Sequence, residues 1–174
     1  MVTHFKSSSR LPVSVPTVVE LMPGDVALGE VGDQLKTLLG SCVSVILCDP
    51  RRTIGAMCHI VFTGHPKPEH SHNTAYGLVA MDDMFTRLRT KGVNPRMCQA
   101  YVFGGGNMFP QIFSKKHVGA TNSEWVLDFL HAHNIPVVRQ SVGGTGYRKI
   151  SWTVGVSEPV VETVFAEQDT HHDR

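Results

Sequence analysis

The sequence predicts one α+β domain, a layered structure of mainly antiparallel strands with two principal amphipathic helices. Short runs rich in β-branched and aromatic residues dominate the chain, and only two segments have a helical period instead. The runs and the two helical segments do not alternate strictly, as they would in a doubly wound parallel sheet. The chain of 174 residues is long enough for one such domain with its own core.

The predicted strands are apolar runs of five to ten residues, most of them bounded by Gly, Pro, Asn, Asp or Ser. They cover residues 17–21, 38–47, 56–62, 99–103, 137–141 and 149–156. The ends of the chain, 1–15 and 167–174, are polar or charged, so we expect them to be flexible and the domain to span 16–166.

The two predicted helices each present one apolar face. The first runs from about residue 73 to 91, with apolar residues at three- and four-residue steps: Ala80, Met81, Met84, Phe85 and Leu88. The second is expected to open at Thr121, which forms a capping-box pattern with Glu124, and to stop at Asn134 and Pro136.

Charge and cysteine usage exclude several classes of function. Sixteen Lys and Arg oppose 15 Asp and Glu, a formal charge of +1, so we expect no nucleic-acid partner. No apolar run has the length of a signal peptide or a membrane span, so we expect a cytoplasmic protein without membrane insertion. The four cysteines have no CxxC spacing, which is typical of reduced thiols.

A predicted hairpin brings a cysteine to a histidine. The stretch Asp49–Arg52 favours a type I turn, and a turn centred between its two middle residues places Cys42 opposite His59 on one face. Val43 and its alternate neighbours then face a core on the other side, together with Cys58.

The chemistry of this pair suits nucleophilic catalysis. A free thiol has a pKa of about 8.5, and His59 could take its proton and later protonate a leaving group. Thr37, Ser41 or a backbone carbonyl could orient the imidazole ring, and the amide of Cys42 is a candidate oxyanion donor behind the small Gly40. The alternative is that both side chains only pack in the core.

Three other patterns leave alternatives open. The glycines of Phe103–Phe109 could cradle a phosphate, but no GK[ST] or GxGxxG pattern accompanies them, so a close backbone approach to the site is favoured. The stretch Ser141–Lys149 is either a long hairpin with a solvated edge or a substrate-facing loop. His65, His70 and His72 fit no standard zinc spacing, so a polar loop is favoured and no metal or other cofactor is expected.

Four sequence blocks together resemble the chemoreceptor glutamine deamidases of the CheD family over most of the chain. They are Thr37–Val43, Gly55–His59, Gly104–Phe109, and Gly143–Gly144 followed by Arg148–Lys149. The resemblance implies that Cys42 is the nucleophile, His59 its base and Thr37 the third catalytic residue. We also predict substrate-binding or supporting roles for Gly40, Ser41, Gly105, Gly106, Asn107, Gly143, Gly144 and Arg148.

The resemblance implies hydrolysis of glutamine side-chain amides to glutamate on the cytoplasmic helices of chemotaxis receptors, with release of ammonia. It also implies a CheC-type phosphatase as a possible partner and a layered α/β fold. Two alternatives remain at this point. One is a non-catalytic chemotaxis adaptor that binds such a phosphatase, and the other is a cysteine hydrolase, an esterase or deamidase, that acts on another protein.

Overall fold

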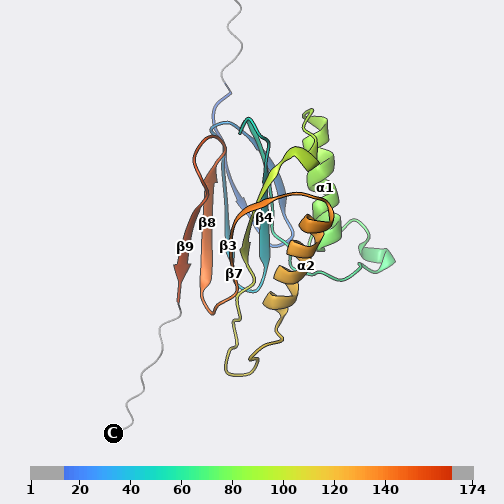
Figure 1. The fold of residues 1–174 in the computed structure, drawn as a ribbon, viewed down its shortest axis with the longest axis vertical. Coiled ribbons are helices and arrows are strands. Elements are labelled where there is room, and N and C mark those ends of the chain that lie inside the picture. Colours follow the sequence, from blue (N-terminus) through green and yellow to red (C-terminus); the bar gives the residue numbers. More distant parts are fainter. Residues whose placement is uncertain (1–13, 166–174) are drawn as a thin grey trace, which may run out of the picture.

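Two β-sheets pack face to face, and two helices cover the outer face of one of them (Figure 1). The structure is a computed structural model that describes residues 14–165, so residues 1–13 and 167–174 of the ends predicted to be flexible lie outside it. The four-stranded sheet contains, in spatial order, β1 (Val18–Leu21), β3 (Gln34–Leu39), β8 (Tyr147–Thr153) and β9 (Val160–Val164). The five-stranded sheet contains β2 (Val26–Glu30), β5 (Ile54–Cys58), β4 (Val43–Cys48), β6 (Gln99–Gly104) and β7 (Val137–Val142).

Most strand pairs are antiparallel, as predicted, and only β1 with β3 and β6 with β7 are parallel. The structure therefore confirms the α+β class and its mainly antiparallel strands. It also adds two strands that the sequence did not predict, β2 and β9. Both are short edge strands, and β9 is largely exposed, so neither has the continuous apolar run by which a buried strand is recognised.

Two hydrophobic cores separate the three layers. β4 lies in the middle of the five-stranded sheet and is buried on both faces. Val43, Val45 and Leu47 face the helices, whereas Ile46 and Cys48 face the four-stranded sheet. Because side chains alternate along a strand, every second residue of β4 lies between the two sheets.

The two helices are α1 (Gly77–Thr90) and α2 (Val118–Ala132). All five apolar residues predicted to form the buried face of α1 are buried. The prediction that α2 begins with a capping box was wrong, because Thr121 lies inside the helix. His117 caps it instead, with Nδ1 accepting a hydrogen bond from the amide of Ala120 at 3.2 Å.

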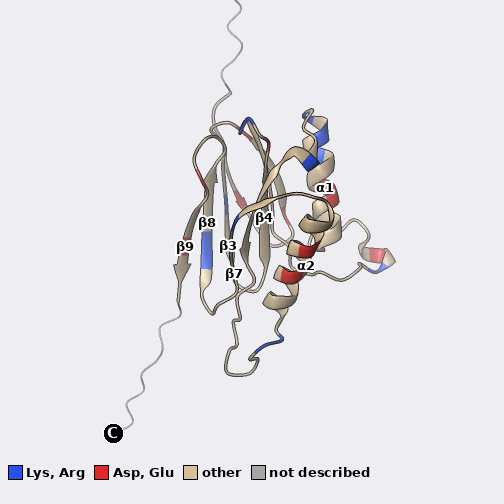
Figure 2. Cartoon of the chain, viewed as in Figure 1, with Lys and Arg blue, Asp and Glu red and all other residues tan. Residues whose placement is uncertain are grey.

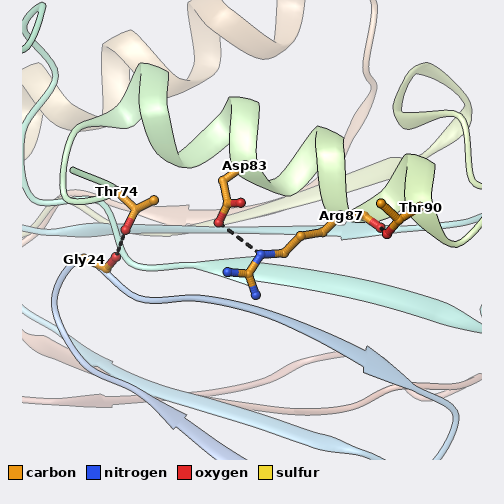
Figure 3. Close-up of polar contacts among 5 residues, drawn as sticks. All are labelled: Gly24, Thr74, Asp83, Arg87 and Thr90. Atoms are coloured by element: carbon orange, nitrogen blue, oxygen red, sulfur yellow. Dashed lines mark hydrogen bonds and ion pairs between the residues drawn. The ribbon is translucent and has the colours of Figure 1, made fainter. Parts of the chain in front are cut away.

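Polar contacts hold α1 and the segment before it (Figure 3). The Thr74 hydroxyl, just before the helix, donates to the carbonyl of Gly24, and Arg87 forms an ion pair with Asp83 at 3.0 Å. The amide of Gly24 in turn donates to the carbonyl of His59 at 2.8 Å. The start of α1 is therefore tied through one residue to the end of β5.

The predicted strand 38–47 contains the end of one strand and most of another, and the two belong to different sheets. β3 ends at Leu39, the chain bends through Gly40–Cys42, and β4 begins at Val43. The bend therefore carries the chain from the four-stranded to the five-stranded sheet.

The predicted turn between β4 and β5 forms, but the predicted register was wrong by two residues. The amide of Arg52 donates to the carbonyl of Asp49 at 2.9 Å, as in a four-residue turn. Arg52 then adopts a left-handed φ of 57°, and two extra residues enter the loop before Asp49 pairs with Ile54. The Asp49 carboxylate accepts from the amides of Thr53 and Ile54, which stabilises this longer turn. Since the shift is even, each side chain keeps its predicted face.

Charged residues of both signs are scattered over the molecule in Figure 2, in agreement with the small net charge. Among the described residues, no helix is long and apolar enough to cross a membrane.

Candidate active site

The bend Gly40–Cys42 lies at one end of the molecule, where several strands terminate. Val43, at the start of β4, pairs with Gly104 at the end of β6 and also forms a bridge with Ile60, just after β5. Leu39, at the end of β3, pairs with Arg148 near the start of β8. The segments that carry the predicted site residues therefore meet around this bend.

The hydroxyl of Thr37 determines which nitrogen of His59 carries the proton. Thr37 Oγ1 lies 2.9 Å from the carbonyl oxygen of Leu21 and 2.8 Å from Nδ1 of His59. A carbonyl oxygen only accepts hydrogen bonds, so Thr37 donates to Leu21 and accepts from the Nδ1–H of His59. The Nε2 atom then keeps its lone pair, and the ring is held in a tautomer that can accept a proton there.

His59 is also fixed through its backbone. Its amide donates to the carbonyl of Asp25 at 3.0 Å, and its carbonyl accepts from Gly24. The residue is 3 % exposed, and this burial lowers the pKa of His59, against smaller opposing effects of the Leu21 carbonyl and the Asp25 carboxylate. The imidazole is therefore neutral near pH 7, which a general base requires.

Cys42 is partly exposed and lies on the same side of the sheet as His59. The register observed here makes the two residues diagonal neighbours rather than directly opposite, a separation of about 7–8 Å between Cα atoms. Burial raises the pKa of the Cys42 thiol. Because the pKa of Cys42 is raised and that of His59 is lowered, the resting pair is a neutral thiol and a neutral imidazole, and among the described residues the thiol makes no hydrogen bond.

All three carbonyl groups of the bend are held by hydrogen bonds. The amide of Gly106 donates to Gly40 at 2.9 Å, and the amide of Gly105 donates to Cys42 at 2.8 Å. The carbonyl between them, that of Ser41, accepts from Nδ2 of Asn122 at 3.1 Å. Because C=O and N–H point in opposite directions across a trans peptide, this contact turns the amide of Cys42 away from α2. Within residues 14–165 that amide has no acceptor, as an oxyanion donor requires.

The sequence analysis missed Asn122. The residue is 1 % exposed, and its Nδ2 also donates to the carbonyl of Val61 at 3.2 Å. It therefore bridges the bend at Cys42 and the chain just after His59. Its spacing from Val126 and Leu130 places it on the buried face of α2, and a buried amide needs partners, so the sequence did contain a signal.

The glycines of residues 104–106 allow the loop after β6 to press against the bend, as expected. Gly104 has a φ of 112° and Gly105 a φ of 65°, both of which disfavour other residues. A Cβ atom on Gly104 would overlap the carbonyl oxygen of Cys42, and one on Gly105 would overlap the hydroxyl of Ser123. Glycines at positions 104 and 105 therefore allow the backbone after β6 to contact the bend that carries Cys42.

Arg148 connects the two loops beside the bend. Its guanidinium donates to Ser141 Oγ at 3.0 Å and to the carbonyls of Gly104 at 3.3 Å and Gly143 at 2.7 Å. The residue is buried, and burial lowers the pKa of this guanidinium. The hairpin interpretation of residues 141–149 was wrong, because β7 and β8 belong to different sheets.

Asn107 organises the loop that follows the glycines. Its backbone amide donates to the carbonyl of Gly144 at 2.8 Å. Its side chain donates through Nδ2 to the carbonyl of Phe113 and accepts through Oδ1 from the backbone amide of Phe109. A cavity of about 240 Å³ opens beside this loop and reaches Ser41, next to Cys42. Its lining is mostly apolar and includes Phe109 and Phe113, both of which are exposed to solvent. The arrangement can accept an apolar side chain beside the thiol.

The other three cysteines differ from Cys42. All four are free thiols, but Cys48, Cys58 and Cys98 are buried. Burial raises the pKa of Cys58 and of Cys98 to about 12, and of Cys48 to about 11. Within residues 14–165, no group of three or more His, Cys, Asp or Glu side chains is arranged to hold a metal ion.

A family model and several known proteins match this chain. Residues 63–163 match the family model described as "CheD chemotactic sensory transduction". This span contains Asn122 and Arg148 but begins after His59. The chain is similar to the "Probable chemoreceptor glutamine deamidase CheD 2" of Albidiferax ferrireducens, 38% identical over 143 residues, which are 80% of this chain and 83% of that protein.

Two further relatives have similar names. The "Probable chemoreceptor glutamine deamidase CheD 3" of Dechloromonas aromatica is 35% identical and covers 78% of this chain and 81% of its own length. The "Probable chemoreceptor glutamine deamidase CheD" of Pseudomonas fluorescens is 32% identical and covers 81% of each chain.

Proposed function

Because this chain belongs to the CheD family, we propose that it hydrolyses the side-chain amides of glutamine residues on chemotaxis receptors, forming glutamate and ammonia. One observation carries the assignment of its residues. His59, whose tautomer is fixed by Thr37, lies on the same face as a partly exposed Cys42, and the three carbonyl groups of the bend that carries Cys42 are all hydrogen-bonded.

The reaction begins with ionisation of the nucleophile. The proton of Cys42 moves to Nε2 of His59, and the resulting imidazolium stays hydrogen-bonded to Thr37 through Nδ1–H. The resting thiol makes no hydrogen bond, so its side chain must turn towards the ring, a contact that tightens as the substrate binds. The Cys42 thiolate then attacks the carbonyl carbon of the glutamine amide.

The tetrahedral intermediate places a negative charge on the former carbonyl oxygen. The amide of Cys42 donates a hydrogen bond to it, and Asn122 keeps that peptide group in position. His59 returns its proton to the amide nitrogen, the C–N bond breaks and ammonia leaves. Water then gives a proton to His59 and attacks the thioester, and the C–S bond breaks. The product leaves as glutamate after losing its acidic proton to solvent, and His59 returns its proton to the Cys42 thiolate.

The apolar cavity beside Ser41 accommodates side chains that neighbour the target glutamine. Its exposed aromatic rim, with Phe109 and Phe113, suits an apolar residue one turn away on a receptor helix. Acting on the cytoplasmic part of a receptor places the enzyme in the cytoplasm. A CheC-type phosphatase as a partner stays a prediction from the family resemblance.

Two other functions were considered, a non-catalytic adaptor and a cysteine hydrolase with another protein substrate. The Thr37–His59 hydrogen bond favours an enzyme, because an adaptor needs neither a fixed tautomer nor a free Nε2 lone pair.

The experiment is incubation of a purified receptor cytoplasmic fragment with the protein, followed by peptide mass spectrometry. We expect conversion of particular glutamines to glutamate by the wild type and by Cys98→Ala, a buried cysteine outside the site, but not by Cys42→Ala. Equal conversion by Cys42→Ala would disprove the assignment of the nucleophile, and no conversion by any variant would disprove the substrate.

A further inference from the structure

One polar side chain in the core is unexplained by the proposed mechanism. The hydroxyl of Ser44 on β4 is fully buried and has no hydrogen-bond partner among residues 14–165. A buried polar group without a partner destabilises a protein, and such groups are rare in native structures. Alanine would fill this position without that cost.

The hydroxyl lies in the layer that contains the catalytic candidates. Val43 and Val45 face the helices, so Ser44 between them faces the four-stranded sheet. On β6, Ser44 pairs with Phe103, which belongs to the apolar core between the sheets. The hydroxyl therefore has apolar neighbours on that side.

On the other side of β4, Ser44 lies opposite His59. The bridge of Val43 with Ile60 and the pairing of Ile46 with Met57 have the same register, which places Ser44 and His59 between them as partners. Val43 and Ile60 exchange both backbone hydrogen bonds, so the next pair along is of the close, non-hydrogen-bonded kind. Its Cα atoms are about 4.5 Å apart, and the two side chains share a face.

Cys42 is the neighbour of Ser44 along the chain on that same face. Cys42 packs against the core between the sheets, the core that Ser44 also faces. Residues two apart along a strand are separated by roughly 6.6 Å, so rotation of the thiol and the hydroxyl towards each other can bring them within hydrogen-bond distance. The hydroxyl thus lies beside both members of the Cys42–His59 pair, which are only diagonal neighbours of each other.

In the proposed mechanism one donor, the Nε2–H of the His59 imidazolium, stabilises the Cys42 thiolate, and a second donor would stabilise it further. Burial disfavours the charged form of Cys42, and no described side chain offsets this effect in the resting structure. A serine hydroxyl has one proton to donate, and its orientation is free when no acceptor holds it. A hydroxyl that is unpaired beside a neutral thiol gains an acceptor when that thiol ionises.

We propose that Ser44 is a further catalytic residue, whose hydroxyl donates a hydrogen bond to the Cys42 thiolate once the thiol proton has moved to His59. Ser44 keeps its own proton throughout, since the S–H bond breaks and the N–H bond forms at Nε2. The inference rests on the proposed function only in taking Cys42 as the nucleophile.

The test compares Ser44→Ala with the wild type in alkylation of Cys42 by iodoacetamide across a range of pH. Loss of the hydroxyl raises the apparent pKa of Cys42 by about one unit, which is a roughly tenfold slower alkylation at pH values below that pKa. With a receptor fragment, kcat falls by a similar factor while KM is unchanged. Thermal unfolding of the variant occurs at the same or a higher temperature, because an unpaired buried group has been removed.

Ser151→Ala is the matched control. This serine lies on the outer face of the four-stranded sheet, where its hydroxyl accepts a hydrogen bond from Gln34 at 2.8 Å. Its removal leaves the pH profile of Cys42 unchanged. If Ser44 has only a structural role, Ser44→Ala will leave both the pH profile of Cys42 alkylation and kcat unchanged, and that result would overturn the inference. The proposed function would still stand in that case, because the reactivity of Cys42 in the wild type does not depend on this result.

Discussion

Substitution of Thr37 by valine tests the role of the hydrogen bond between Thr37 and His59. The two side chains have similar shapes, so the change removes mainly the hydroxyl that joins His59 Nδ1 to the carbonyl of Leu21. Both of these buried groups lose their partner, at about 1–3 kcal/mol each. We therefore expect Thr37→Val to lower the free energy of unfolding by about 2–6 kcal/mol, measured by urea denaturation.

The catalytic effect of the same substitution follows from the tautomer. Without the acceptor at Nδ1 the ring is no longer held with Nε2 free, and a lost orienting hydrogen bond of about 1.5–3 kcal/mol lowers kcat by roughly ten- to a hundredfold. Thr37→Ser keeps the hydroxyl and should retain most activity. Alkylation of Cys42 should slow in Thr37→Val and in His59→Ala, and adding Thr37→Val to His59→Ala should slow it no further, since the threonine acts through the histidine. An additive effect in the double variant would refute this reasoning.

The remaining predictions concern the backbone, the reactive thiol and pH. Gly105→Ala should destabilise the protein by more than about 2 kcal/mol in thermal unfolding because it adds a steric overlap to a positive φ, whereas Gly143→Ala, with φ of 78° but open space, should cost only about 1–2 kcal/mol. Equal losses would refute the overlap. Iodoacetamide should label Cys42 faster than the three buried cysteines, and Asn122→Ala should slow that labelling; uniform labelling of all four would contradict the account. Burial lowers the pKa of His59, so the stability it contributes is present above its ordinary pKa of 6.5 and is lost as the pH falls below that value. His59→Gln should reduce this loss in urea titrations at pH 7.5 and 5.5, and an identical pH dependence in both proteins would show that another group is responsible.

Hydrophobic alternation was sufficient to assign the faces of β4 and β5, because successive side chains along each strand point to opposite faces of the sheet. The register was not predictable in the same way. It depends on Arg52, whose left-handed φ extends the turn and whose guanidinium reaches the carbonyls of Gly155 and Ser157 more than 100 residues away. No local pattern encodes such a contact.

Tertiary contacts also explain the other differences. The run 38–47 has uniform strand propensity, but the chain bends at Gly40, where a Cβ atom would come within 3.0 Å of the sulfur of Met108, a tight contact. Helix α2 begins early because His117 caps it in place of the expected threonine. The sequence analysis did not single out Asn122 or Ser44, because their roles depend on tertiary neighbours. Asn122 binds two carbonyl groups, and the buried hydroxyl of Ser44 has no hydrogen-bond partner among the described residues.

The most direct test of the central claim is detection of the thioester itself. The protein is mixed with a receptor fragment, quenched in acid during the first turnover and mapped by mass spectrometry. We expect a fraction of the enzyme to carry the receptor fragment, lighter by one ammonia, on Cys42. Conversion of glutamine to glutamate without any adduct on Cys42, and at an equal rate in Cys42→Ser, would contradict the account.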